Sequence, residues 1–465
     1  MKPSMEDQGN RAKTTVCLIS LGCPKNQVDS EILSVGLLEE GFSFVPDPDQ
    51  ADVIILTTCS FIEEAVQESL EILEQLADYR REGRCRCLLL AGCLIQRYGR
   101  DLCRTLPDVD LFLGSEVIEG AGRILARYLH GQTEQTFFTK SPFSRPKGAS
   151  PLYEGRQALG PWAYVKIAEG CSNDCSYCTL PLIRGPLRSR PSEEIVSEVT
   201  HLAQQGVQEI NLVAQDVTAY GRDWDSSRSG SLGTLLTQLE RVEGIHWIRL
   251  LYCHPAHLDE DTIARMGDME GICPYLDLPI QHVSRPILSA MGRPYDEERL
   301  RGLIERVRSA RPDVALRTTV MVGFPGETDR DVEQLLAFLR DIRFHHLGVF
   351  CYSPEEGTAA CRREVSVSDA EKHDRRDTVM ALQAEISQAI QAGFVGTFQE
   401  VLVEGPHEEN PLCLRGRTRY QAPEVDGCVI FPKGVPAGAG LATARIVRAL
   451  TYDLEAEILS EVLPA

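Results

Sequence analysis

The chain has 465 residues, 43% of them hydrophobic and 25% charged, and its formal net charge is -20 at pH 7. This length predicts two or three domains, and the composition excludes a disordered or fibrous protein. The acidic balance argues against broad attraction to phosphate backbones and favours a basic partner, although it does not exclude RNA. The opening MKPSMEDQGNRAK is polar, and the longest apolar run, CLLLAGCLI, is too short to span a bilayer. We therefore expect a cytoplasmic protein with no membrane or DNA partner.

From residue 14 to residue 131, short aliphatic runs alternate with helical patterns. The runs are TTVCLISLG, DVIILTT, CRCLLLAG and VDLFLGS. This alternation predicts an α/β domain with a parallel sheet. Cys23, Cys59 and Cys93 each follow one of the first three runs. Ligands gather outside the carboxyl ends of parallel strands, so the topology predicts three thiols at one edge of the sheet. Cys87 is the nearest rival to Cys93, but it begins its strand instead of following it.

Residues 132–160 are rich in Ser, Pro, Gly and Gln and predict a linker or a long surface excursion. Six further aliphatic runs then alternate with helical stretches: WAYVKIAEG, EINLVAQD, WIRLLYCHP, YLDLPIQ, LRTTVMVGFPG and LGVFCYSP. They predict a partial (β/α) barrel or curved parallel sheet, whose site lies at the carboxyl ends of its strands. A charged helical segment over 366–391 closes this part. From about residue 395, short strands broken by Gly and Pro predict a small β-barrel.

The first barrel strand leads into GCSNDCSYC, in which Cys171, Cys175 and Cys178 form a CxxxCxxC motif. Sixteen cysteines in a reducing compartment are expected to be metal ligands, catalytic thiols or buried hydrophobes, not a disulfide framework. A zinc site would need a fourth ligand, and His201 lies well beyond the loop on a predicted helix. Three thiolates can instead hold three irons of a four-iron cluster and leave one iron open to a small-molecule ligand.

The segment EGCSNDCSYCTLPLIRGPLRSRP resembles the cluster loop of radical S-adenosylmethionine (SAM) enzymes, and within them of the methylthiotransferases. The resemblance implies that Cys171, Cys175 and Cys178 hold a 4Fe-4S cluster whose open iron chelates SAM. An electron from the cluster then cleaves SAM to a radical that takes hydrogen from an unreactive carbon. The protein's own part is to bind, orient and exclude water. The resemblance also places Tyr177 near the adenine.

Further stretches carry the same resemblance along nearly the whole chain. SLGCPKN, TTCSFIEEA and AGCLIQRY match the family's N-terminal domain, so Cys23, Cys59 and Cys93 would bind a second, auxiliary 4Fe-4S cluster that delivers sulfur. VLVEG, GRTRYQAPEVDG and ARI resemble a TRAM domain, an OB-like barrel used for substrate binding. The implied domains are a methylthiotransferase N-terminal domain over 14–131, a radical SAM core over 157–392 and a TRAM domain over 395–461.

Further candidate residues lie at predicted strand ends. VGFPGET is rich in glycine but lacks the GK[ST] of a phosphate loop; Gly323, Gly326 and Glu327 therefore form either a tight turn or a SAM-contacting strand end. Gln215, in AQDVTAYG, faces either the cofactor site or solvent. His282, in PIQHVSRP, is expected to be a structural hydrogen-bonding partner more than an acid or base.

The resemblance divides into a branch that modifies tRNA adenosine and a branch that modifies the β-carbon of an aspartate in small-subunit ribosomal protein twelve. QDVTAYGRD, and YSPEEGT with Glu355 and Glu356, resemble the ribosomal-protein branch. Residues 395–465 carry a net charge of -4, which suits a basic ribosomal protein, free or in the ribosome, better than tRNA phosphates. CLRGRTRY could still form a local basic patch. An electron donor such as flavodoxin or ferredoxin and a sulfur donor are also implied.

Three alternatives remain open at this point. A tRNA adenosine methylthiotransferase would keep the chemistry and change the partner. A non-catalytic iron-sulfur electron carrier would need no SAM site. A SAM-dependent RNA methyltransferase with a TRAM domain would need no iron.

Overall fold

The computed structural model describes residues 13–143, 151–224, 230–432, 438–459 and 463–464. The polar N-terminal stretch before Lys13, residues 144–150 of the predicted linker and the predicted TRAM end at residue 461 lie outside these ranges. The chain divides into two compact units: unit 1 is 1–156 with 182–184, and unit 2 is 157–181 with 185–465. No helix within the described ranges has both the length and the apolar character needed to cross a membrane.

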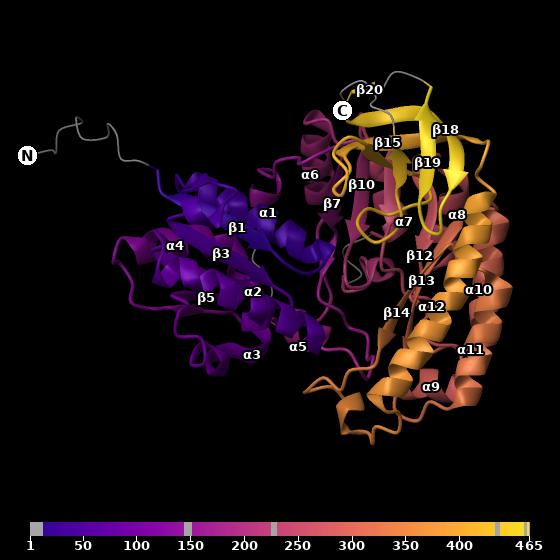
Figure 1. Ribbon diagram of the computed structural model, residues 1–465, viewed down its shortest axis with the longest axis horizontal. Helices are drawn as coiled ribbons and strands as arrows, with labels where there is room; N and C mark the ends of the chain where they lie inside the picture. Colours follow the sequence, from indigo (N-terminus) through magenta and orange to yellow (C-terminus); the bar gives the residue numbers. More distant parts are fainter. Residues whose placement is uncertain (1–12, 144–150, 225–229, 433–437, 460–462, 465) are drawn as a thin grey trace, which may run out of the picture. The chain divides into compact units, whose positions relative to one another are not determined.

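Unit 1, drawn in indigo to purple in Figure 1, is built on a parallel sheet. Its strand order is β2-β1-β3-β4-β5-β6. The four predicted strands form its centre, and two edge strands of two residues each were not predicted, because such short pairs carry no hydrophobic period. The strands are β1 (Thr15–Ser20), β2 (Ser43–Phe44), β3 (Val53–Thr58), β4 (Cys87–Gly92), β5 (Leu111–Gly114) and β6 (Phe137–Phe138).

Helices cover both faces of this sheet. Successive β4 side chains alternate between the faces: Leu89 packs with α1 (Pro24–Glu39) and α4 (Ala121–Leu129), and Leu90 packs with α2 (Glu63–Arg81) and α3 (Cys93–Cys103). Every β4 residue is buried. A strand covered on both faces reads as a continuous apolar run, which is why CLLLAG shows no alternation in the sequence.

Unit 2 contains a second parallel sheet, with strand order β14-β13-β12-β11-β10-β7. The strands follow one another in chain order, and β7 and β14 stand at the two ends of the sheet, as in a partial barrel. The six predicted strands are confirmed; they are β7 (Trp162–Lys166), β10 (Glu209–Val213), β11 (Trp247–Leu250), β12 (Ile272–Asp277), β13 (Ala315–Val322) and β14 (His346–Cys351).

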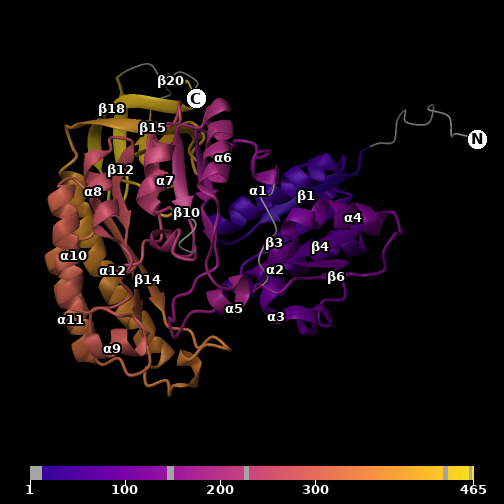
Figure 2. The same cartoon turned by 180° about the vertical axis from the view of Figure 1, so that it is seen from behind.

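The crossover helices of unit 2 pack on the outside of this sheet, where the main apolar core lies (Figure 2). The helix predicted over 366–391 is observed as α12, which packs along β14. The helices are α6 (Ser192–Gln204), α7 (Leu232–Leu239), α8 (Glu260–Asp268), α9 (Arg285–Ala290), α10 (Glu297–Ala310), α11 (Asp329–Ile342) and α12 (Asp369–Ala392).

The C-terminal part of unit 2 is a small barrel, as predicted. β15 pairs with both β16 and β18, which closes the sheet around a core that includes Val401, Phe431 and Ile446. The strands are β15 (Phe398–Pro406), β16 (Leu414–Thr418), β17 (Val429–Phe431), β18 (Gly440–Ala449), β19 (Leu454–Ile458) and β20 (Leu463–Pro464). Together with the two parallel sheets, this barrel confirms the predicted fold class.

A buried ion network joins the barrel to the second sheet. The Arg417 guanidinium contacts Glu209 Oε2 of β10 and Glu404 Oε1 of β15, both at 2.5 Å. Glu209 also accepts from Arg249 Nε of β11 at 2.9 Å. The two arginines and two glutamates balance in charge, and all four side chains are at most 5% exposed.

We expect Arg417→Met to lower the stability of unit 2 by about 3–5 kcal/mol, because it removes one of the two arginines that face the buried Glu209 carboxylate and leaves Glu404 with only the partly exposed Arg415. Urea unfolding followed by tryptophan fluorescence measures this, since Trp162, Trp224 and Trp247 are the only tryptophans and all lie in unit 2. Arg445→Met is the control: its pair with Glu457 is half exposed and should contribute about 0–1 kcal/mol. Equal effects of the two variants would contradict the prediction.

Candidate active site

Three thiols of unit 1 follow three adjacent strands. Cys23 comes after β1 and caps α1, Cys59 comes after β3, and Cys93 is the first residue of α3, directly after β4. β1, β3 and β4 are neighbours, so all three stand at the carboxyl edge of the sheet. Cys87 begins β4 at the opposite end, fully buried in the core.

Two glycines allow this edge to form. Gly22 and Gly92 precede Cys23 and Cys93 with φ of 102° and 105°, a backbone region that strongly favours glycine. A Cβ on Gly22 would lie 2.6 Å from Asn26 Nδ2 and 2.9 Å from the Cβ of Cys59. Glycine at position 22 therefore lets the turn that carries Cys23 approach Cys59.

The auxiliary thiols, as we name Cys23, Cys59 and Cys93, influence one another electrostatically. The pKa of Cys93 is raised to about 12, chiefly by burial; the charge of Arg184 opposes this rise, and the neighbouring Cys59 and Cys23 add to it. Burial also raises the pKa of Cys59, although the backbone N–H groups of Phe61 and Ser60 donate to its sulfur. Such buried thiols lose their protons when a metal binds them, so a metal group would suit this edge.

The CxxxCxxC loop of unit 2 begins after β7 and the short β8 (Ala168–Glu169). Cys171 N donates to Gly185 O at 3.0 Å, and Ser176 donates through N to Met291 O at 2.9 Å and through Oγ to Ala290 O at 2.8 Å. Gly170, at φ 73°, lies so close to Pro186 that a Cβ would stand 2.1 Å from its carbonyl oxygen. The loop is therefore held at its start and in its middle.

The loop's thiols are enclosed on one side and open on the other. Cys175 and Cys178 pack against a buried cluster that includes Tyr177, Met291 and Phe324. Burial raises the pKa of Cys178 to about 12 and that of Cys171 to about 11. Cys171 also borders a pocket of about 220 Å³, whose other lining residues include Ser172, Asn173, Asp216, Arg222 and His257.

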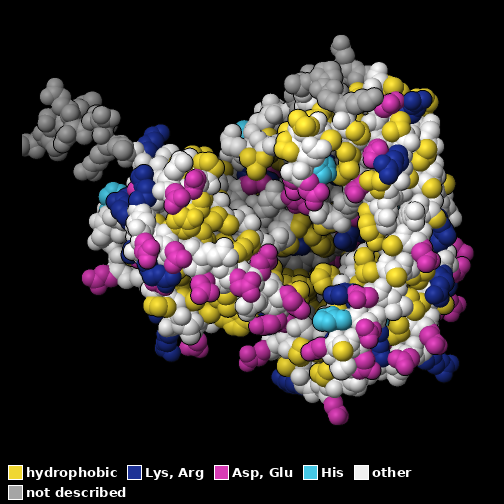
Figure 3. All heavy atoms as spheres, viewed as in Figure 1, with side chains coloured by type: hydrophobic (Ala, Val, Ile, Leu, Met, Phe, Trp, Pro, Cys, Tyr) yellow, Lys and Arg dark blue, Asp and Glu magenta, His cyan; other side chains and the backbone are white. Residues whose placement is uncertain are grey.

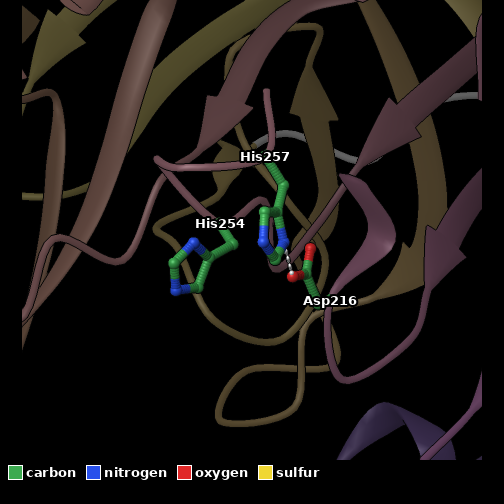
Figure 4. Close-up of side chains that lie close together, drawn as sticks. All are labelled: Asp216, His254 and His257. Carbon is green, nitrogen blue, oxygen red and sulfur yellow. Dashed lines mark hydrogen bonds and ion pairs between the residues drawn. The ribbon is translucent and has the colours of Figure 1, made fainter. Parts of the chain in front are cut away.

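One triad of potential metal ligands stands closer together than either set of cysteines. Asp216, His254 and His257 form the one group within the described ranges whose ligand atoms all lie within 4.8 Å (Figure 4). Neither cysteine set meets that spacing, which disfavours a single zinc ion at either place. A cubane cluster binds each iron through its own thiolate, so the donor chemistry of both cysteine sets suits it.

Asp216 is the centre of a hydrogen-bonded brace with Asn173 and His257. Asp216 Oδ1 accepts from Thr218 Oγ1 at 2.6 Å and Ala219 N at 3.1 Å. Asp216 Oδ2 accepts from His257 Nδ1 at 2.6 Å and Asn173 Nδ2 at 2.9 Å, so the carboxylate lone pairs are fully used. Despite burial, these bonds hold the pKa of Asp216 below its usual range. The Asn173 bond ties the end of β10 to the cysteine loop.

The predicted SAM-contacting residues differ in what they contact. Gln215 Nε2 donates to Glu169 Oε1 at 3.1 Å, and its buried Oε1 has no hydrogen-bond partner within the described ranges, which leaves an acceptor for a ligand's N–H group. Glu327 Oε1 instead accepts from Gly323 N and Arg375 Nη1, both at 2.9 Å, and so ties its own turn to α12. A Cβ on Gly323 would lie 2.3 Å from Lys372 Cγ, whereas Gly326 is open.

Tyr177 is 8% exposed, and its hydroxyl accepts from Arg293 Nη2 at 2.7 Å. The sequence did not indicate that Arg293 and Gly292 contact the cysteine loop, because MGRP is typical of an ordinary helix end. His282 Nδ1 accepts from the backbone N–H groups of Val283 and Ser284, both at 2.9 Å, which is the structural role expected for it.

Comparisons with known proteins cover nearly the whole chain. Residues 15–114 match Uncharacterized protein family UPF0004, residues 165–339 match the Radical SAM superfamily, and residues 395–459 match the TRAM domain. A ribosomal protein uS12 methylthiotransferase RimO from Anaeromyxobacter sp. (strain K) is 45% identical over 96% of this chain and 94% of its own. The RimO of Geobacter sulfurreducens is 43% identical over 97% of this chain and 100% of its own. The chain belongs to the RimO family.

The RimO match confirms the predicted methylthiotransferase family and, within it, the ribosomal-protein branch over the tRNA branch. A solved structure supports the fold: the radical S-adenosylmethionine methyltransferase TsrM from Kitasatospora setae matches with a TM-score of 0.53 at 16% identity, over 72% of this chain and 73% of that one. Radical SAM enzymes of the RimO family use SAM and 4Fe-4S clusters, as the sequence predicts for this chain.

Gly292 provides a test of how the loop is held. Its φ is 74°, and a Cβ would lie 2.4 Å from Asp174 O of the cysteine loop. We expect Gly292→Ala to displace this loop and lower SAM cleavage about tenfold, the lower end of the effect of disturbing a ligand's support. Gly396→Ala is the matched control, with φ 85° and nothing within 4 Å of its Cβ. Equal losses in both variants would mean that backbone strain alone is responsible.

Proposed function

We propose that this chain replaces a C–H bond at the β-carbon of a specific aspartate in ribosomal protein uS12 with a methylthio group. The observation that carries the proposal is the pair of three-thiol sets, one at the carboxyl edge of each parallel sheet. In RimO-type chemistry, one cluster with SAM supplies the radical, and the auxiliary cluster delivers sulfur.

The residue roles divide between the two units. In unit 2, Cys171, Cys175 and Cys178 would hold the radical-generating cluster. Their apolar neighbours exclude water from one side of it. The Oε1 atom of Gln215, which has no hydrogen-bond partner within the described ranges, suits the amino group of SAM. Gly326 leaves room for SAM to approach the backbone closely. Contacts of SAM with Tyr177, Gly323 and Glu327 also belong to the proposal. Glu327 Oε1 already accepts two hydrogen bonds, whereas its buried Oε2 has no hydrogen-bond partner within the described ranges.

In unit 1, Cys23, Cys59 and Cys93 would hold the auxiliary cluster. The proposed domain bounds remain 14–131, 157–392 and 395–461. Unit 2 contains both the second sheet and the barrel, because the Arg417 network packs them into one compact body.

The barrel's arginines support a basic protein substrate over tRNA. Arg415 pairs with Glu404 and Glu408, and Arg417 is buried against Glu209. Arg445 and Arg448 pair with Glu457 and Glu455. A phosphate-binding surface needs unneutralised cations, and the CLRGRTRY segment offers few. On the face drawn in Figure 3, Lys and Arg side chains of the described residues lie scattered among Asp and Glu.

The partners beyond uS12 follow from the chemistry. Cleavage of SAM needs an electron donor, such as a flavodoxin or ferredoxin, and methylthiolation needs a sulfur donor. Ribosomal proteins are made and assembled in the bacterial cytoplasm, so we place the enzyme there.

The test is to incubate the anaerobically reconstituted protein with SAM, a reductant and sulfide, together with uS12 and, in parallel, bulk tRNA. Mass spectrometry of both substrates reads the result. A methylthio gain on an aspartate of uS12 is expected. A methylthio gain on tRNA adenosine alone would overturn the assignment of uS12 as the substrate. Absence of SAM cleavage would favour an electron carrier, and iron near background would favour an iron-independent methyltransferase.

A further inference from the structure

A buried arginine contacts the auxiliary thiols. Arg184 is the last residue of α5 (Leu180–Arg184), and residues 182–184 belong to unit 1, although they lie only a few positions after Cys178 in the sequence. The side chain is 3% exposed. Its Nη2 lies 3.1 Å from Cys93 Sγ, within hydrogen-bond distance for an N–H donor and a sulfur acceptor.

The guanidinium is held in place by two other partners. Nη1 donates to Asp29 Oδ2 at 2.8 Å, and Nη2 donates to Asn26 Oδ1 at 2.8 Å. Asn26 is itself oriented, because its Nδ2 donates to the carbonyl oxygens of Leu21 at 3.2 Å and Thr58 at 3.0 Å. Leu21 and Thr58 directly precede the Gly22–Cys23 turn and Cys59, so the same amide that orients Arg184 also ties two of the cysteine turns together.

We infer that Arg184 is a positioning residue for the auxiliary cluster, fixing the Cys93 sulfur and setting the cluster's reduction potential. The inference rests on the proposed function, in which the auxiliary thiols hold that cluster. A cluster on thiolates carries negative charge, and its potential depends on net charge and on hydrogen bonds to sulfur. A guanidinium is permanently charged, and its planar fork can serve Asp29, Asn26 and Cys93 together.

The geometry gives the effect a sign. A positive charge beside the cluster stabilises its more negative, reduced form, so Arg184 raises the potential. Asp29 partly neutralises that charge and acts in the opposite direction. Arg184→Gln should therefore move the midpoint potential to a more negative value, and Asp29→Asn should move it to a more positive one. Arg184→Lys keeps the charge but loses the fork, so it should restore part of the shift.

The measurement uses the full chain with Cys171, Cys175 and Cys178 changed to alanine, so that only the auxiliary cluster remains. Iron content is measured first, and the midpoint potential is then determined by redox titration followed by electron paramagnetic resonance. Arg156→Gln is the matched control: Arg156 is equally buried in unit 1, with Nε donating to Glu31 Oε2 at 2.8 Å. It should leave the potential unchanged.

The possible outcomes distinguish failure of this inference from failure of the proposed function on which it rests. Shifts of the midpoint potential in opposite directions in Arg184→Gln and Asp29→Asn support the inference. If Arg184→Gln does not hold iron, a shifted midpoint potential in Arg184→Lys supports it instead. The inference is overturned if the potentials do not change, if the two variants shift in the same direction, or if Arg156→Gln shifts the potential equally. It is also overturned if no Arg184 or Asp29 variant folds. Arg184 would then be a structural residue only. A parent protein without auxiliary iron would overturn the proposed function as well.

Discussion

Replacing Cys171, Cys175 and Cys178 together by alanine should reduce SAM cleavage to background while the iron of unit 1 stays bound. The two cysteine sets lie in different compact units, each with its own apolar core. Loss of one ligand set therefore removes one cluster and leaves the fold that positions the other. Formation of 5'-deoxyadenosine measures the cleavage, and iron content with electron paramagnetic resonance measures the remaining cluster.

Cys273→Ala is the control for this variant. Cys273 lies in β12 of the same unit and is 1% exposed, but it is remote in sequence from the CxxxCxxC loop. Its loss should lower stability slightly and spare SAM cleavage, because a buried thiol that binds no metal contributes mainly packing. The assignment of the radical site is wrong if the triple variant still cleaves SAM, or if Cys273→Ala loses cleavage to the same extent.

The sheet of unit 1 could be predicted because β3 and β4 are buried along their whole length and appear as apolar runs, and the sheet of unit 2 because short runs rich in aliphatic residues alternate with helical stretches. The edge strands β2 and β6 could not, since each has only two residues. The auxiliary thiols were predicted from strand order alone: three cysteines that follow three neighbouring parallel strands lie at one edge of the sheet, as they do here. A spacing motif was needed only for the CxxxCxxC loop.

What escaped prediction depends on contacts between residues distant in the sequence. Arg184 lies 91 positions from Cys93, and Arg293 lies 116 positions from Tyr177. No local period or propensity marks such a pair. The brace formed by Asp216, Asn173 and His257 was missed for the same reason. The sequence showed that polar residues follow β10. It did not show that Asp216 there would pair with Asn173 of the cysteine loop and with His257 of the segment after β11.

Replacing Cys23, Cys59 and Cys93 together by alanine should have the opposite effect: SAM cleavage persists, and methylthiolation of uS12 falls to background. All three side chains stand at one edge of unit 1, so their removal empties the auxiliary site without touching the CxxxCxxC loop. The radical would still form, but sulfur would have no donor. 5'-Deoxyadenosine and the mass of uS12, measured in one reaction, separate these steps.

Cys87→Ala is the matched control for the auxiliary set, because Cys87 lies on the same strand as the turn to Cys93 but at its opposite end, inside the core. It should keep both activities. If the auxiliary triple variant still methylthiolated uS12, unit 1 would not be the source of sulfur. If it lost SAM cleavage as well, the two sites would not be separable, and Arg184 would be the first residue to test, since it follows the radical loop in sequence while contacting Cys93.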